Sequence, residues 1–226
     1  MTEERPHAAV CAVVLAGGRA TRMGGVDKGL QPFLGQPLVA HALHRLNGQS
    51  RGAPGLVAIN ANRNLDRYGQ FGVPVWADLN NDFDGPLAGL QTAFLHCMAH
   101  AGSHFDTPRP IEFLLTVPCD SPLFPPDLLT RLHTALIDQR ADIAIALAPE
   151  LQNDGSTALR PQPVFALLKT TLRISLENYL SSGARKIDTW LYQHSVARVA
   201  FDQPHDAPHA FANANTLAEL HTLERL

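Results

Sequence analysis

Short apolar runs separated by longer amphipathic segments recur along this 226-residue chain. Most of the runs are continuous rather than alternating, as expected for strands covered on both faces. Strands that alternate with helices favour a mostly parallel sheet joined by right-handed crossovers. We therefore predict an α/β three-layer sandwich built on a Rossmann-like sheet. The predicted strands are Val10–Leu15, Gly55–Ile59, Val73–Trp76, Ile111–Val117, Ile143–Ala146 and Val196–Ala200, and the predicted helices are Leu38–Leu46, Pro86–His100, Pro126–Gln139 and Leu168–Leu180.

One segment departs from this alternation. Between Ala148 and Phe165 the chain carries Asn153-Asp154-Gly155 and three prolines, which are typical of turns. We expect a small flap or hairpin there, outside the main sheet. No repeat or low-complexity linker divides the chain, so we predict a single domain over residues 1–226.

Charge and composition argue against several classes of protein. A net charge of −3 with no basic run does not suit a nucleic-acid-binding protein. No apolar run approaches the ~20 residues of a membrane helix, and the N-terminus lacks the apolar core of a secretion signal. Cys11, Cys97 and Cys119 form no CxxC pair, so we expect reduced thiols. These features predict a soluble cytoplasmic protein, which we expect to be a monomer.

The first predicted strand runs into a loop rich in glycine and positive charge, AVCAVVLAGGRATRMGGVDKGL. Glycines let a loop turn sharply, so that its backbone N–H groups can surround phosphate oxygens. The loop contains neither GxxxxGK[ST] nor GxGxxG. Arg19 and Arg22 can fork onto β- and γ-phosphate oxygens, and Lys28 can act as a point charge near the reacting phosphorus. The alternative is an ordinary turn with solvated cations, but the whole constellation favours a triphosphate site.

Asp120 follows the predicted strand Ile111–Val117, at the sheet edge where ligands bind in open α/β folds. A phosphoryl-type transfer from a nucleoside triphosphate needs a divalent ion, and Mg²⁺ is usually held by one or two carboxylates together with phosphates and water. Asp120 is therefore the predicted Mg²⁺ ligand, with a turn cap as the alternative.

Asn60 and Asp78 follow the second and third predicted strands. Carboxylate and amide oxygens at this edge can accept hydrogen bonds from the donor groups of a nucleotide base. The alternatives are a turn residue at Asn60 and a helix or turn cap at Asp78. His96 and His100 have a zinc-binding spacing on a predicted helix, but no third ligand accompanies them.

The stretch LAGGRATRMGGVDKGL resembles the signature LAGGxxxRMGGxDK of the molybdenum cofactor guanylyltransferases, which are nucleotidyltransferases. Four further stretches are similar to this family: INANR, DGPLAGL, VPCDSPLFPPDLL and FANANTLAEL. The resemblance therefore covers nearly the whole chain. It departs at Leu217 and Ala218, where the family has Pro and Glu, and at Gln162, where some members have His.

The resemblance implies transfer of GMP from MgGTP to the terminal phosphate of a molybdopterin-type cofactor, with release of pyrophosphate. It also implies transient contact with cofactor-biosynthesis proteins and acceptor molybdoenzymes. Cytidylyl transfer is the nearest rival, although that subgroup typically has LAAG where this chain has LAGG. A silent nucleotide-binding module is a second rival. The implied catalytic residues are Arg22, Lys28 and Asp120; the implied GTP-binding residues are Leu15, Ala16, Gly17, Gly18, Arg19, Lys28, Asn60, Asp78 and Asp120; Asn213 and Asn215 would face the molybdopterin.

Overall fold

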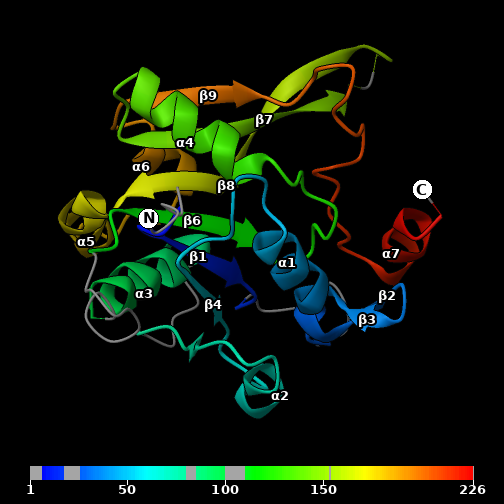
Figure 1. The fold of residues 1–226 in the computed structure, drawn as a ribbon, viewed down its shortest axis with the longest axis horizontal. Coiled ribbons are helices and arrows are strands. Elements are labelled where there is room, and N and C mark those ends of the chain that lie inside the picture. Colours follow the sequence, from blue (N-terminus) through cyan, green and yellow to red (C-terminus); the bar gives the residue numbers. More distant parts are fainter. Residues whose placement is uncertain (1–6, 18–25, 80–84, 100–109, 153, 226) are drawn as a thin grey trace, which may run out of the picture.

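A computed structural model describes residues 7–17, 26–79, 85–99, 110–152 and 154–225. Its centre is a seven-stranded sheet in the order β5-β4-β1-β6-β8-β7-β9 (Figure 1). The sheet strands are β1 (Val10–Leu15), β4 (Leu56–Asn60), β5 (Val75–Trp76), β6 (Phe113–Pro118), β7 (Ile143–Leu151), β8 (Thr157–Lys169) and β9 (Val196–Ala200), and a separate hairpin is formed by β2 (Pro32–Phe33) and β3 (Gln36–Pro37). The helices are α1 (Leu38–Asn47), α2 (Leu65–Gly69), α3 (Pro86–Ala99), α4 (Leu128–Asp138), α5 (Arg173–Ser181), α6 (Ile187–Leu191) and α7 (Leu217–Leu223), with 3₁₀ turns η2 (Lys28–Leu30) and η3 (Thr170–Leu172).

The sheet is mixed but mostly parallel. β1 pairs in parallel with β4 and β6, and β7 pairs in parallel with β9. β8 lies between β6 and β7 and runs antiparallel to both. Helices cover both faces of the sheet (Figure 1), which confirms the predicted three-layer α/β sandwich.

The segment predicted as a separate flap belongs instead to the sheet. β7 continues to Leu151, and the chain returns at once as β8, which pairs with β7 from Thr157 to Leu168. The far end of this hairpin extends beyond the last residue of β8 that pairs with β6, Ala166. The prediction of a hairpin is therefore right, but its placement outside the main sheet is wrong. For the same reason the predicted helix Leu168–Leu180 begins too early, since α5 starts only at Arg173.

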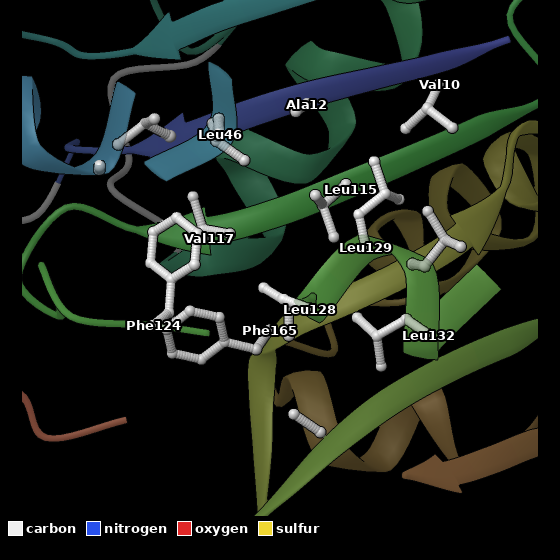
Figure 2. Close-up of a cluster of buried hydrophobic side chains, with 14 of the residues drawn as sticks. Val10, Ala12, Leu46, Leu115, Val117, Phe124, Leu128, Leu129, Leu132 and Phe165 are labelled. Carbon is white, nitrogen blue, oxygen red and sulfur yellow. The ribbon is translucent and has the colours of Figure 1, made fainter. Parts of the chain in front are cut away.

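Both faces of the sheet are buried, as the continuous apolar strands predict. Along β1 the side chains of Val10, Ala12 and Val14 join one core cluster, while Cys11 and Val13 join the other. The first cluster is filled from α1 and α4 (Figure 2). The second is filled from α3, α5 and α6.

A third, smaller cluster fixes the C-terminal end of the chain. α7 packs its Leu220 and Leu223 against Phe33 and Leu38, beside the β2–β3 hairpin (Figure 1). Glu224 adds a hydrogen bond, since its Oε1 accepts from the Leu34 N–H at 2.9 Å. This contact brings the last segment of the chain back to the region that follows β1.

The cysteines differ in part from expectation. Cys11 on β1 and Cys97 on α3 form a disulfide in the structure, with their Cα atoms 6.4 Å apart, so the prediction of reduced thiols is wrong for this pair. The two residues are 86 positions apart, and only the packing of α3 on the sheet brings them together. Cys119 is a free, buried thiol, as predicted. Among the helices of the described ranges, none is long and apolar enough to cross a membrane.

His7, which precedes β1 and lies beside Thr130 of α4, is a buried titratable group. It is only 3% exposed, and its Nε2 lies 3.3 Å from Thr130 Oγ1. Burial, followed by the charges of His133 and Arg51, lowers the pKa of His7 from 6.5 to about 4. The imidazole is therefore neutral in the folded protein at neutral pH.

We expect His7 to make the protein less stable in mild acid. Between pH 6.5 and 4 the unfolded chain binds a proton that the folded His7 does not, so stability is full above that window and falls through it. The loss that the two pKa values imply is about 3 kcal/mol. Thermal unfolding of His7→Phe between pH 7 and 4 is expected to show a weaker dependence on pH than the wild type. The exposed His209→Gln is the control, and an unchanged dependence in His7→Phe would contradict the assignment.

Candidate active site

The candidate site lies where three neighbouring parallel strands end. Leu15, the last residue of β1, pairs with Asn60 on β4 and with Pro118 on β6. The chain continues this alignment, since Ala16 N–H donates to Asn60 O at 2.8 Å and Cys119 N–H donates to Leu15 O at 3.1 Å. The loops after these three strands therefore leave the sheet side by side, at the edge where open α/β folds bind ligands.

Lys28 and Asp120 meet at this edge. The Lys28 Nζ lies 2.6 Å from Asp120 Oδ2, and it also donates to Asn215 Oδ1 at 2.9 Å. The Lys28 and Asp120 side chains are 22% and 17% exposed, so the pair is shielded without being cut off from solvent. Asp120 and Asn215 thus both bind the ammonium group of Lys28. All three are predicted site residues, and Lys28 and Asn215 are 187 positions apart in the sequence.

Asn215 is held in place by the start of α7. Thr216 is the N-cap, and its side chain accepts from the Glu219 N–H at 3.2 Å. Glu219 reaches back and accepts from the Asn215 N–H at 2.6 Å, in the manner of a capping box. The Ala214 N–H donates to Asp120 O at 3.1 Å. The backbone of Ala214 therefore binds Asp120, and the side chain of Asn215 binds Lys28, so this segment contacts both members of the ion pair.

A second group of polar residues surrounds Asp78. Asn60 Nδ2 donates to Asp78 Oδ1 at 2.8 Å, and Asn62 Nδ2 donates to Asp78 Oδ2 at 2.6 Å. Asn62 also accepts from the Asp78 N–H at 2.7 Å. Asn60 is only 3% exposed and gives its other amide hydrogen bond to Trp76 O at 3.0 Å. Asn60 therefore lies behind Asp78 as a buried support, while Asp78 faces the edge.

Glycine permits the close approach of α3 to this group. A Cβ on Gly89 would lie 2.4 Å from Asn60 Oδ1 and 2.9 Å from Leu15 Cδ2. A Cβ on Gly17 would lie 3.0 Å from Asn62 Nδ2. The helix itself begins at Pro86, after Gly85 with a φ of +69°, in agreement with the start that the sequence suggests.

The structure thus gathers most of the predicted residues it describes. Leu15, Ala16 and Gly17 leave β1 between the Asp78 group and the Lys28 group. Asn213 does not join either group; it is exposed and borders a cavity of about 350 Å³, together with Glu150 and Gln162 from the β7–β8 hairpin. Gly18, Arg19 and Arg22 lie outside the described residues.

One cluster of possible metal ligands occurs elsewhere in the described part of the chain. The side chains of Asp127, His205 and Asp206 lie within 4.8 Å of one another. Arg131 already occupies this cluster, with its Nη1 2.7 Å from Asp206 and 3.5 Å from Asp127. Because one guanidinium pairs with both carboxylates, the cluster is an ion-pair network that ties α4 to the chain after β9.

Comparison with known proteins identifies the family of this chain. Residues 12–200 match the MobA-like NTP transferase domain. The chain is 56% identical over 218 residues to the molybdenum cofactor guanylyltransferase of Acidovorax ebreus, covering 96% of both chains. It is 52% identical over 219 residues to that of Albidiferax ferrireducens, covering 97% of both. The chain belongs to the molybdenum cofactor guanylyltransferase family.

Solved structures show how widely the fold of this family is used. The molybdopterin-guanine dinucleotide biosynthesis protein A of Archaeoglobus fulgidus superposes with a TM-score of 0.68 at 19% identity, covering 95% of this chain and 97% of that one. A 4-diphosphocytidyl-2C-methyl-D-erythritolsynthase of Anaerococcus prevotii superposes with a TM-score of 0.65 at 11% identity, covering 96% and 94%. Two proteins with different names therefore share this fold, so the fold alone does not decide which reaction a protein carries out.

Three residues of the site were not assigned from the sequence. Asn62 was visible in the stretch INANR, two positions after Asn60 and hence on the same side of an extended chain. Glu219 stands three residues after Thr216, the spacing of a capping box. Tyr68, whose phenol lies 2.5 Å from Asp27 Oδ1, has no local pattern that would indicate a contact 41 positions away.

We expect Gly89→Ala to destabilise the protein, although the same change inside an exposed helix is stabilising by up to about 1 kcal/mol. The new methyl group would overlap Asn60 Oδ1, so we expect a loss of about 1–3 kcal/mol. Urea unfolding measures the change. Gly69→Ala on α2 is the matched control, because its Cβ would meet nothing within 4 Å. A neutral Gly89→Ala would show that Asn60 is not fixed at this contact.

Proposed function

We propose that this protein transfers GMP from GTP to the terminal phosphate of a molybdopterin-type cofactor and releases pyrophosphate, the reaction its family name describes. The observation that carries the proposal is the meeting of Lys28, Asp120 and Asn215 at the carboxyl ends of β1 and β6. It places a cation that can stabilise phosphate charge beside a carboxylate that can hold a metal ion.

The Asp78 group suits the base of the nucleotide. The carboxylate can accept from the N1–H and N2 amino groups of guanine, and Asn60 and Asn62 hold one oxygen each. A carboxylate fixed in this way favours guanine, because a base without those donors would displace water from its remaining acceptor positions and replace it with nothing. In this proposal Asp78 binds the base, and Asn60 and Asn62 hold the carboxylate of Asp78 in position. The backbone of Leu15, Ala16 and Gly17 lies along the nucleotide.

Lys28 and Asp120 suit the phosphates. The ammonium of Lys28 can stabilise the charge that develops around the α-phosphorus, while Arg19 and Arg22 are proposed to hold the β- and γ-phosphates. The acceptor phosphate is already anionic, so the reaction needs alignment rather than a general base.

Mg²⁺ belongs to the proposal with Asp120 as its protein ligand. The Lys28 ammonium, 2.6 Å from Asp120 Oδ2, repels a bare cation, so the pair suits a metal that arrives with anionic phosphate oxygens. Bound there, the metal would neutralise charge on the phosphates and on the departing pyrophosphate.

The cavity of about 350 Å³ beside Asn213 suits the second substrate. Asn213, which lines it, is two residues before Asn215, whose side chain binds Lys28. Glu150 and Gln162 line the cavity, and their side chains are linked by a hydrogen bond of 2.8 Å. A pterin ring carries the same pair of donors as guanine on its pyrimidine side, which suits a carboxylate such as Glu150. The proposal also includes a cytoplasmic location, a monomeric state and transient contacts with cofactor-biosynthesis proteins and acceptor molybdoenzymes.

The direct test is to incubate the protein with Mg²⁺, molybdopterin and each nucleoside triphosphate in turn, and to quantify pyrophosphate and dinucleotide. We expect product with GTP. Product with CTP alone would replace guanylyl transfer by cytidylyl transfer, and binding of GTP without product would favour a silent nucleotide-binding module.

We expect Lys28→Ala to act mainly on kcat. A contact that strengthens only in the transition state lowers kcat when it is removed, and charge-stabilising donors of this kind are worth ~10²–10³-fold. Steady-state kinetics in GTP measures the split between kcat and KM. Lys169→Ala is the control, since it breaks a lysine–aspartate pair of 3.2 Å elsewhere on the sheet. If Lys28→Ala raises only KM, the lysine is a tether for the nucleotide.

We expect Asp78→Ala to weaken the preference for GTP over CTP by roughly five- to a hundredfold, because a hydrogen bond to a buried partner is worth ~1–3 kcal/mol. Calorimetric titration with both nucleotides measures the change. Asp66→Ala, which removes an exposed carboxylate on α2, is the control. Equal affinity of the wild-type protein for CTP and GTP would contradict the base assignment.

A further inference from the structure

Lys28 lies in a short 3₁₀ turn whose preceding residue is anchored to another part of the chain. Asp27 occupies the N-cap position of η2, but its side chain makes no cap hydrogen bond. Its carboxylate is bonded instead to the α2 region, where Tyr68 Oη donates to Oδ1 at 2.5 Å and Asn64 Nδ2 donates to Oδ2 at 2.9 Å. Both oxygens of Asp27 are therefore used to hold the turn against α2.

Tyr68 also contacts the residue that follows Lys28. A Cβ placed on Gly29 would lie 2.4 Å from the Tyr68 Oη and 3.3 Å from its Cζ. No residue other than glycine fits at position 29 unless the phenol of Tyr68 moves. The single hydroxyl of Tyr68 thus bonds the residue before Lys28 and touches the residue after it.

The phenol is built into the core. Tyr68 is fully buried in the cluster between the sheet, α1 and α4. Burial raises the pKa of its hydroxyl far above the usual range, so the group is a hydrogen-bond donor at neutral pH. A buried, protonated donor is a fixed reference point for a surface turn.

We propose that Tyr68 is a positioning residue for the transfer reaction: through Asp27 and Gly29 it fixes the backbone of Lys28, and so the place of its ammonium between Asp120 and Asn215. A lysine side chain loses rotamer entropy when it is fixed. It can reach one point reproducibly only when its backbone is held. This inference rests on the proposed function, because it assigns Tyr68 to the same site.

Tyr68→Phe is the main test, because it removes only the hydroxyl and keeps the ring in the core. We expect kcat for GTP turnover to fall roughly ten- to a hundredfold, since small displacements of a catalytic group have effects of that size. The KM for GTP is expected to change less than threefold. Tyr179→Phe on α5 is the matched control. It removes a phenol hydrogen bond of 2.9 Å to the backbone oxygen of Lys186. A Tyr68→Phe variant with lower thermal stability and wild-type kcat would overturn the proposal.

Two double variants test the route. Asp27→Ala is expected to lower kcat as Tyr68→Phe does, and the pair together is expected to be no worse than the more severe single change, because both remove the same bond. Gly29→Ala is expected to be nearly inactive. Adding Tyr68→Phe to it is expected to restore part of the activity, since the closest remaining atom of the ring lies 3.3 Å from the new methyl. If the losses of kcat from Asp27→Ala and Tyr68→Phe multiply in the double variant, Tyr68 does not act through Asp27. If Tyr68→Phe restores no activity to Gly29→Ala, Tyr68 does not act through Gly29.

Hydrogen exchange separates this inference from the function it rests on. The Leu30 N–H donates to Asp27 O at 3.3 Å, and the Gln31 N–H donates to Lys28 O at 3.0 Å. Both amides are expected to exchange faster in Tyr68→Phe than in Tyr179→Phe. If the wild-type protein releases no pyrophosphate, the proposed function is wrong, while this measurement still tests Tyr68. Equal exchange in the two variants would overturn the positioning role.

Discussion

The contact between Lys28 Nζ and Asp120 Oδ2 is the interaction on which the arrangement of the site depends. Its two residues follow β1 and β6, which pair in parallel along their whole length, so the sheet itself brings the two loops together. Because this ion pair is partly buried, the cost of desolvating its two charges offsets much of their attraction, so the pair is weak evidence for stability. Its importance is positional, because it fixes where a positive charge stands relative to a carboxylate. The capping of α7 adds Asn215 to the same point, and the packing of α7 on the β2–β3 hairpin holds that helix in place.

Most of the fold could be predicted from the sequence, because strands buried on both faces leave long apolar runs. β1 and β9 have the predicted bounds, and the other predicted strands differ mainly at their ends. β8 was not predicted as a strand of the main sheet, because Pro161 and Pro163 are poor strand residues. The structure accommodates them locally: the β7–β8 register shifts between Ile145 and Ala146, and Pro163 falls within that irregularity. Pro161 lies beyond Ala166, the last residue of β8 that pairs with β6, where a missing N–H costs the inner sheet nothing.

The site could be predicted in part, for a physical reason. Residues at strand ends, such as Asp78 and Asp120, are found because the strands themselves are visible and parallel strands end at one edge. Supporting residues such as Asn62 and Tyr68 act through contacts across 16 and 41 positions, which only the folded chain defines. Asn60 shows the difference: its place at the end of β4 was predictable, but its burial behind Asp78 follows from the close approach of Gly89 on α3.

The two polar groups of the site are organised differently, and the difference suits their proposed tasks. In the Asp78 group each carboxylate oxygen accepts from an asparagine amide, so the acceptor is held on both sides and can select a base by shape and donor pattern. In the other group, an ammonium has three N–H donors, and Lys28 gives one to Asp120 and one to Asn215. The third donor is enough to meet a phosphate oxygen without breaking either contact. The charge can therefore be in place before the nucleotide arrives, which is the condition under which electrostatic stabilisation needs no reorganisation during the reaction.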